Sequence, residues 1–384
     1  MSESPFDSVT VEAYGTPRGR FNLASTLDFN FRDWTAFALT TSITAPAEAS
    51  FELGDDSGWD RLSELVGLGA EFRVFVNDRC RLTGRVEQFT ASLDARQSTT
   101  QRFCVRTRLS DAACHSAPAG IRLAGQSVKQ FVLAVYADLG FTEADFDFRG
   151  DVSRDIMTGK TSRGGRPPRA LEPLKDDEAK VNPPETCFAA ADRHLRRHGF
   201  MHWDGPDGKI VVAAPDDEQE PLGVLTARRD GQLNNIVSID RDQDVSQAPT
   251  ELGVFGTGGK AGVARAKVSA IRTNADLIAR GFRRRAAILD EGMRTRELAT
   301  RRVAREFSQR NRGLDRLTVT VDGLSYREGR EPVPWAPDTT VDVVADPLGG
   351  VLGAFYIEDV QMARAAQSGD VTRLSLVRRG AWQL

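Results

Sequence analysis

The stretch AEFRVFVNDRCRLTGRVEQF, residues 70–89, decides the fold of this chain. Apolar and polar side chains alternate from Phe72 to Val76, which predicts a strand with one buried face. Asn77-Asp78 predicts a tight turn, and the alternation resumes after it. Together these signals predict a β-hairpin.

A second stretch, TTVDVVADPLGGVLGAFYIEDV at residues 339–360, follows the same plan of strand, turn, apolar residue, glycine and strand. Two hairpins of one plan near opposite ends of the chain predict two β-barrels of one kind. The alternative, that any two hairpins look alike, stays open at this point.

The sequence between these stretches changes its period. Apolar residues at helical spacing predict a helix that begins after Ser127, with Gln130 completing a capping box, and ends at Gly140. A second helix follows Pro183-Pro184 and ends at Gly199. A hairpin with its turn in GPDG, residues 205–208, comes next, so we expect a small α/β domain here.

The predicted fold is therefore α+β and mainly β, with two β-barrel domains, a small α/β middle domain and an inserted helical segment. The predicted first barrel domain spans 1–118, and the middle domain spans 119–230 with a mobile basic loop at about 158–180. The predicted second barrel domain spans 231–384, with an arginine-rich helical insertion at about 274–312. A basic arm that contacts a partner or nucleic acid is the alternative for the loop.

Composition narrows the classes of function. Hydrophobic residues make up 40% of the 384 residues and charged residues 27%, which is ordinary for a globular protein. The net charge of −3 lacks the basic excess of duplex-binding proteins. No secretory signal and no apolar run of bilayer length are recognisable. The four cysteines form no CxxC pair, so we expect reduced thiols.

The motif GTGGK, residues 256–260, suggests a phosphate-binding loop. A Walker A loop needs glycine where Val254 stands and a hydroxyl where Ala261 stands. The spacing fits a dinucleotide fingerprint, but no helix is predicted after it. We therefore predict a strand end and a turn, and no cofactor-binding residue.

His194 and His198 are one helical turn apart, and Cys187 lies near the same face, a spacing that can hold zinc. The glutamate of an HExxH motif is missing, and two arginines stand between the histidines. We interpret the histidines, with His202 beyond them, as partly exposed polar residues of a basic helix, and predict no metal site.

Acidic residues gather at Asp55-Asp56, Asp176–Glu178 and Asp216–Glu220. Paired carboxylates hydrolyse glycosides only when a cleft holds them about 5–10 Å apart. These runs are polar and loop-like, so we expect them to be solvated surface. No Gly-x-Ser-x-Gly elbow is present, and the histidines have no evident triad partner. We predict no catalytic residue and no enzyme activity.

A resemblance to a known family rests on four stretches, at residues 59–89, 105–117, 183–212 and 333–379. They include WDRLSELVGLGAEFRVFVNDRCRLTGRVEQF and VRTRLSDAACHSA, then the helix–glycine–hairpin unit, and finally VPWAPDTTVDVVADPLGGVLGAFYIEDVQMARAAQSGDVTRLSLVRR. In this order they resemble the large hub protein of phage baseplates, in the Mu-like branch related to the late-control D proteins.

The resemblance implies a structural protein with two tail-tube-like barrels. Three copies would form a ring that adapts the six-fold tail tube to the three-fold central spike and leaves a channel for DNA. Implied partners are further copies of the chain, the spike, tail tube or tube-adaptor proteins, other baseplate proteins and, as a candidate, the tape-measure protein. The implied location is the virion tail baseplate, with assembly in the host cytoplasm. Contractile and flexible tails, and phages and phage-derived particles, stay open.

Two other classes of function remain as alternatives. One is a tail-associated cell-wall hydrolase, which needs two close carboxylates. The other is a carbohydrate-binding adhesin module, which needs exposed aromatic side chains in a groove. The candidates for that role are the five tryptophans, Trp34, Trp59, Trp203, Trp335 and Trp382.

Overall fold

The computed structural model describes most of the chain, namely residues 7–14, 23–28, 34–53, 67–93, 99–121, 127–149, 180–197, 199–256, 268–290, 293, 296–327, 331–365 and 369–381. Within these residues, no helix is both long enough and apolar enough to cross a bilayer. The predicted basic loop at 158–180 lies outside the described residues, apart from Lys180.

The first half of the fold is an antiparallel sheet that we call the first β-unit. Its strands, in spatial order, are β3 (Trp34–Ser42), β4 (Glu48–Leu53), β7 (Thr99–Arg106), β6 (Arg79–Leu93), β5 (Glu71–Val76) and β1 (Val9–Tyr14), with β2 (Leu23–Asp28) beyond β1. The predicted tight turn joins β5 to β6, and both Asn77 and Asp78 have positive φ, 49° and 58°. Such φ values suit the right-handed twist of a hairpin.

The second β-unit has the same strand order. It consists of β12 (Ile236–Asp242), β16 (Arg316–Asp322), β21 (Gly369–Arg378), β20 (Val351–Ala365), β19 (Thr339–Ala345) and β11 (Val224–Ala227). The last strands differ, because β11 runs parallel to β19 whereas β1 runs antiparallel to β5. A small hairpin of β17 (Ser325–Tyr326) and β18 (Val333–Pro334) lies between β16 and β19.

The two β-units also match in register. Each has an inward-facing row across its first three strands, Phe37–Phe51–Phe103 in the first and Ile239–Val319–Leu374 in the second. The first strand of each unit carries a one-residue bulge two positions before the row, at Thr35 and Val237. The fourth strand carries another at Glu87 and Glu358. The prediction that residues 70–89 and 339–360 form equivalent hairpins is confirmed.

Helices and a small sheet lie between the two units in sequence. They are α2 (Arg108–Cys114), α3 (Val128–Ala137), α4 (Cys187–Arg197), β8 (Phe146–Phe148), β9 (Met201–Asp204) and β10 (Ile210–Ala213). The capping box of Ser127 and Gln130 is present, and Gly140 and Gly199 follow the helices with positive φ of 75° and 79°. The predicted hairpin pairs β9 with β10.

The inserted segment is not wholly helical. It comprises β13 (Glu251–Gly256), β14 (Val268–Thr273), α5 (Ala275–Ala279), β15 (Arg285–Leu289) and α6 (Arg296–Asn311). The prediction of helix across 274–312 was wrong for β15, which pairs with β13. Its sequence RAAIL has high helix propensity, and tertiary pairing overrides that weak preference. The strand β13, expected in the second barrel, belongs to this three-stranded sheet.

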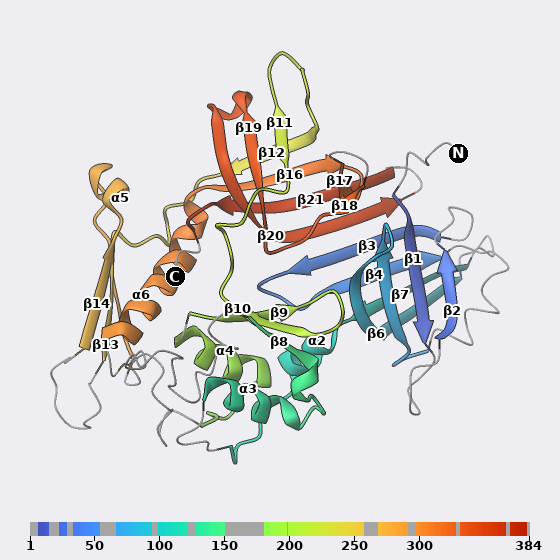
Figure 1. Cartoon of the computed structure of the whole chain (residues 1–384), viewed down its shortest axis with the longest axis horizontal. Helices are drawn as coiled ribbons and strands as arrows, with labels where there is room; N and C mark the ends of the chain where they lie inside the picture. Colours follow the sequence, from blue (N-terminus) through green and yellow to red (C-terminus); the bar gives the residue numbers. More distant parts are fainter. Residues whose placement is uncertain are drawn as a thin grey trace, which may run out of the picture.

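One apolar core runs through both β-units. It includes Phe72 and Val74 from the first unit and Val341 and Leu376 from the second, all fully buried. A separate core joins α3 and α4 to β8 and β10, and a third lies between α6 and β13. Figure 1 shows the two units side by side, with α3 and α4 below them and α6 with β13 and β14 at one flank.

Candidate functional site: the junction of the two β-units

The two β-units join edge to edge along β3 and β20 (Figure 1). The second half of β20 pairs with β3 from Asp359↔Ser42 to Ala365↔Ala36. Its first half pairs with β19 on the same edge, and β21 occupies the opposite edge. We call this β3–β20 pairing the seam. Through it, strands of both units form a single 13-stranded sheet.

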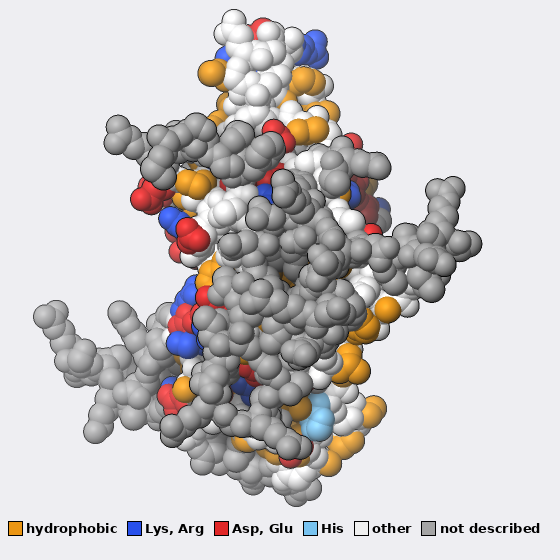
Figure 2. All heavy atoms as spheres, turned by 90° about the vertical axis from the view of Figure 1, so that its right-hand side faces the viewer, with side chains coloured by type: hydrophobic (Ala, Val, Ile, Leu, Met, Phe, Trp, Pro, Cys, Tyr) orange, Lys and Arg blue, Asp and Glu red, His pale blue; other side chains and the backbone are white. Residues whose placement is uncertain are grey.

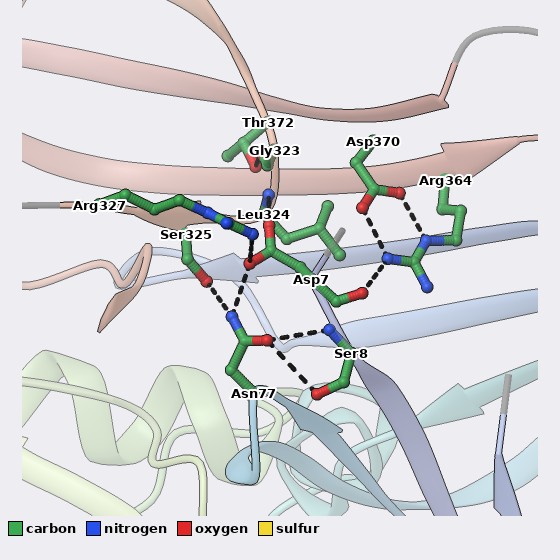
Figure 3. Close-up of polar contacts among 10 residues, drawn as sticks. All are labelled: Asp7, Ser8, Asn77, Gly323, Leu324, Ser325, Arg327, Arg364, Asp370 and Thr372. Atoms are coloured by element: carbon green, nitrogen blue, oxygen red, sulfur yellow. Dashed lines mark hydrogen bonds and ion pairs between the residues drawn. The ribbon is translucent and has the colours of Figure 1, made fainter. Parts of the chain in front are cut away.

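A buried polar network, which we call the clasp, closes the junction at the start of β1 (Figure 3). The Asp7 carboxylate, fully buried, accepts hydrogen bonds from the Leu324 amide at 2.6 Å and from Asn77 Nδ2 at 2.6 Å. Arg327 Nη2 lies 3.0 Å from the same carboxylate. Asn77 Nδ2 also donates to Ser325 Oγ at 2.7 Å. One carboxylate thus connects the β5–β6 turn of the first unit to the loop after β16 in the second.

The clasp continues into a buried ion pair. Arg364 of β20 binds Asp370 of β21 in bidentate fashion, with Nε–Oδ1 at 2.5 Å and Nη2–Oδ2 at 2.6 Å. Arg364 Nη2 also donates to the backbone carbonyl of Asp7. Both side chains are less than 10% exposed. Removing either partner of a pair this deep leaves an uncompensated buried charge, which is strongly destabilising.

The other side of the clasp fixes the β5–β6 turn. The Asn77 amide oxygen accepts hydrogen bonds from the backbone N–H of Ser8 at 2.9 Å and from its hydroxyl at 3.3 Å. Asn77 therefore bonds to both Ser8 and Asp7 through one side-chain amide. Asparagine suits this position, because it tolerates positive φ and its side-chain amide can accept hydrogen bonds through the oxygen while it donates them through the nitrogen.

The middle segment is attached differently to the two units. Its β9 residue Asp204 accepts hydrogen bonds from the Ala47 amide at 2.8 Å and the Thr107 hydroxyl at 2.7 Å, both in the first unit. Burial raises the pKa of Asp204 to about 6. Toward the second unit, Trp203 packs in one apolar cluster with Tyr356, and Arg149 Nη1 lies 3.9 Å from Asp338 Oδ2.

A polar contact links α4 to the inserted helix α6. Arg305 is 2% exposed, and its Nη2 lies 3.5 Å from Asp192 Oδ1. Burial lowers the pKa of Arg305 to about 10. Nearby on β9, burial lowers the pKa of His202 to about 4, and His202 Nε2 lies 2.8 Å from the Tyr136 hydroxyl. His202 is therefore a neutral core residue at physiological pH.

The residues of the zinc hypothesis serve packing. The Cys187 thiol donates to the Val135 carbonyl at 3.3 Å, and burial raises the pKa of Cys187 to about 11. The expectation of partly exposed histidines was wrong for His194 and His202, because both pack inside the core at 0% and 3% exposure. His194 lies against the Phe131 ring, with 3.9 Å between ring centroids, while His198 lies outside the described residues. The part of the chain that the structure describes contains no group of three His, Cys, Asp or Glu placed to hold a metal ion.

Of the GTGGK motif, only Gly256 is described. A Cβ there would clash with the Met293 carbonyl, so the end of β13 packs tightly against another backbone segment.

Of the acidic runs, 55–56 and 176–178 lie outside the described residues. In the third run, the expectation of solvated surface was wrong for Asp217, which is 5% exposed because its carboxylate accepts a hydrogen bond from the Gly380 amide at 2.8 Å.

The tryptophans that the structure describes with their side chains, Trp203 and Trp335, are buried at 4% and 2% exposure. They pack in cores, so they offer no aromatic platform for a sugar. Figure 2 shows acidic and basic side chains close together on the face that carries β2. In the first unit, Arg102 Nη2 of β7 lies 2.6 Å from the Glu52 carboxylate of the neighbouring strand β4.

Sequence reasoning missed the clasp and the seam. The Asn77-Asp78 turn was recognisable from the sequence, but no local pattern near Asp7 or Arg364 indicates which residues they contact. Asp7 and Leu324 are 317 positions apart in the sequence, and Asp7 and Arg364 are 357 positions apart. The seam depends on backbone pairing, which leaves little trace in side chains.

We compared the sequence and the fold of this chain with those of known proteins. No family model and no curated protein matches the sequence. Among solved structures, a tail protein from Neisseria meningitidis MC58 is similar with a TM-score of 0.72 and 16% identity, covering 98% of both chains. The 43 kDa tail protein of prophage MuSo2 from Shewanella oneidensis also gives 0.72, with 17% identity over 98% of this chain and 100% of that chain.

A third similar structure is the Escherichia coli c3393 protein, a component of the type VI secretion system described as similar to the T4 tail proteins gp27 and gp5. Its TM-score is 0.50, at 12% identity over 90% of this chain and 73% of that chain. These likenesses confirm the mainly β, α+β fold class expected from the sequence. The chain has the fold of phage tail proteins.

Proposed function

We propose that this chain is the structural hub of a phage tail baseplate. Three copies form a ring that adapts a six-fold tail tube to a three-fold central spike and leaves a channel through which DNA passes. The supporting observation is the matched pair of β-units, which agree in strand order, register and bulge positions. Two equivalent units per copy give six equivalent units in three copies, which suits a six-fold partner.

The contacts at the junction support this role, because they tie the two units of one chain together. The seam continues the β-ladder between the units, and the Asp7 clasp and the Arg364–Asp370 pair are both buried. A ring that transmits force cannot rely on a hinge between its repeats. The proposed domains are those expected from the sequence, 1–118, 119–230 and 231–384, with the insertion carried by the last and with two shifts at their ends. The helix α2 packs in the core of the middle segment, and β11 pairs with β19 of the second unit.

The proposed partners are those that the ring requires. One face contacts tail tube or tube-adaptor proteins, the other holds the spike, and neighbouring baseplate proteins bind the periphery. The proposed place is the tail of the virion, after assembly in the host cytoplasm. The proposed role is structural and includes no catalytic step. In support, Asp217 and His202 make structural hydrogen bonds.

The test is negative-stain electron microscopy of the purified chain, alone and co-expressed with the spike protein. Three-fold rings with a central hole are the expected result. Monomers in both preparations would overturn the proposal and return the hydrolase and adhesin alternatives to consideration.

A further inference from the structure

Two of the strand edges without a partner among the described residues lie on strands equivalent to those of the seam. One is the outer edge of β12, whose only described ladder partner is β16. The other belongs to the second half of β6, Glu87–Leu93, on the edge that β5 occupies only up to Arg85. Open edges present unpaired N–H and C=O groups and are templates for pairing with another strand.

These two edges are the counterparts of the strands that form the seam. By register, β12 is equivalent to β3, and β6 is equivalent to β20. In the seam, β3 of the first unit pairs with the second half of β20 of the second unit. The open edge of β12 therefore corresponds to the β3 side of a seam, and the open edge of β6 corresponds to the β20 side.

The burial of equivalent positions differs in the way that this correspondence predicts. In the seam, Val360 and Met362 of β20 are buried at 1% exposure each. Their equivalents, counted from the bulges at Glu358 and Glu87, are Phe89 and Ala91. Phe89 is only half-buried and Ala91 is exposed. The β6 positions thus resemble seam positions from which the partner strand is missing.

We propose that β12 of one copy of this chain pairs antiparallel with the second half of β6 of the next copy, in the register of the internal seam. Transferring the pairs Gln361↔Thr40, Met362↔Leu39 and Ala363↔Ala38 to the equivalent strands gives the expected pairs, which are Thr90↔Asp242, Ala91↔Arg241 and Ser92↔Asp240. The partner is a second copy, and this seam between copies rests on the ring proposed above.

The pairing is chemically compatible. Each of the two exposed aspartates faces a neutral hydroxyl residue, Asp240 opposite Ser92 and Asp242 opposite Thr90, so no like charges are set against each other. Self-pairing of two β12 strands centred on Arg241 would instead set Asp240 against Asp242 twice. The contact uses different strands on the two copies, so it is heterologous and repeats around a ring.

Disulfide cross-linking tests the register. The variant Ser92→Cys/Asp240→Cys, in a Cys114→Ser background because Cys114 is exposed, places two thiols opposite each other between copies. The matched control is Ala38→Cys/Ala363→Cys, the equivalent pair of the internal seam, which should cross-link within one chain. Ser92→Cys/Asp242→Cys is shifted by two residues, about 7–8 Å on the diagonal, beyond the usual reach of a disulfide.

The expected result on a non-reducing gel is covalent dimers and trimers for the in-register pair, monomers for the shifted pair, and an internally linked monomer for the control.

A second experiment measures how charge repulsion between the two strands affects assembly. Ser92→Asp, opposite Asp240, should lower the fraction of multimers in light scattering several-fold, and Ser92→Asp/Asp240→Lys should restore it.

The outcomes separate the two proposals. Rings in the microscope without the in-register cross-link would overturn the seam between copies and leave the ring intact. In-register cross-links that produce open filaments would support the seam and overturn the ring. Monomers without cross-links, while the internal control cross-links, would overturn both.

Discussion

The two β-units share one strand order and one register, yet their cores use different side chains. The row across the first unit is aromatic, with Phe51 and Phe103 stacked at 4.9 Å between ring centroids and Phe37 5.4 Å from Phe51. The equivalent row of the second unit is aliphatic, Ile239–Val319–Leu374. What the two units keep in common is the backbone, including bulges at equivalent positions. Bulges bend a strand and increase its local twist, so they set the curvature that each unit shares.

The glutamates at the equivalent bulges of the fourth strands, Glu358 and Glu87, differ in burial. Glu358 of β20 is buried, and Arg316 and Arg312 lie 3.3 Å and 3.6 Å from its carboxylate. Glu87 of β6 has a side chain 30% exposed and lies 3.5 Å from Arg106. The bulge beside a completed seam is buried, and the bulge beside an open edge is partly solvated. The same fold therefore occurs twice in this chain, once with the second half of its fourth strand (β20) paired to another unit and once with that half-strand (β6) unpaired on one edge.

The largest expected effect comes from breaking the junction that holds the units together. Arg364→Ala leaves Asp370 as a buried charge without its bidentate partner, so we expect a loss of about 3–5 kcal/mol in the free energy of unfolding. Urea denaturation followed by tryptophan fluorescence measures it. Arg102→Ala, which removes the exposed pair with Glu52, is the control and should cost less than about 1 kcal/mol. Equal losses for the two variants would show that the clasp does not couple the units.

The second largest effect is expected from truncating equivalent core side chains of the two units. Phe103→Ala should cost about 4 kcal/mol and Leu374→Ala, at the equivalent position, about 3 kcal/mol, because the aromatic ring removes more contact surface and leaves a larger cavity. Both side chains are fully buried. Thermal and urea denaturation of the two variants give the comparison. A much larger loss for Leu374→Ala would mean that the aliphatic row, and not the aromatic one, carries the shared core.

The attachment of the middle segment to the first unit should depend on pH. The pKa of Asp204 is 3.8 in its ordinary state and is raised by burial to about 6 in the fold. Between pH 4 and 6 the unfolded chain ionises this group while the folded chain keeps it protonated, so its contribution to stability falls as pH rises. The difference, about two pKa units, corresponds to about 3 kcal/mol.

Asp204→Asn tests this directly, because one amide oxygen can accept both hydrogen bonds that now end on Oδ2. The stability of Asp204→Asn relative to the wild type should rise by about 3 kcal/mol from pH 4 to pH 7, measured by urea denaturation at each pH. Asp207→Asn, in the exposed turn of the same hairpin, is the matched control. A constant difference between Asp204→Asn and the wild type across this range would contradict the prediction.

The smallest effect is expected at the contact between α4 and α6, outside both units. Arg305 Nε and Nη1 have no hydrogen-bond partner among the described residues, and Asp192 also pairs with Arg196 at 2.5 Å. Arg305→Met should therefore change the free energy of unfolding by less than about 1 kcal/mol, since an apolar side chain of similar length replaces a poorly satisfied buried charge. Thermal denaturation measures it, and a loss as large as that of Arg364→Ala would show that the insertion is clasped as tightly as the units are.

The sequence by itself determined the local elements. Alternating apolar residues and the Asn77-Asp78 turn specified the first hairpin, and Ser127 with Gln130 specified the start of α3. The two hairpins were recognisable as one plan, although the glycines that suggested the match are not equivalent. Gly84 stands three residues before its bulge, where the second unit has Phe355. A Cβ at Gly84 would clash with the Arg106 carbonyl.

Only the tertiary structure decided how these elements join. The seam consists of backbone hydrogen bonds, which every non-proline residue can make, so no side-chain pattern marks which edge pairs with which. The clasp joins residues more than 300 positions apart, and β15 became a strand because β13 offered it a ladder. Turns, caps and strand patterns depend on neighbouring residues, so the sequence shows them directly. Which strands pair with each other depends on which strand edges the folded chain leaves open.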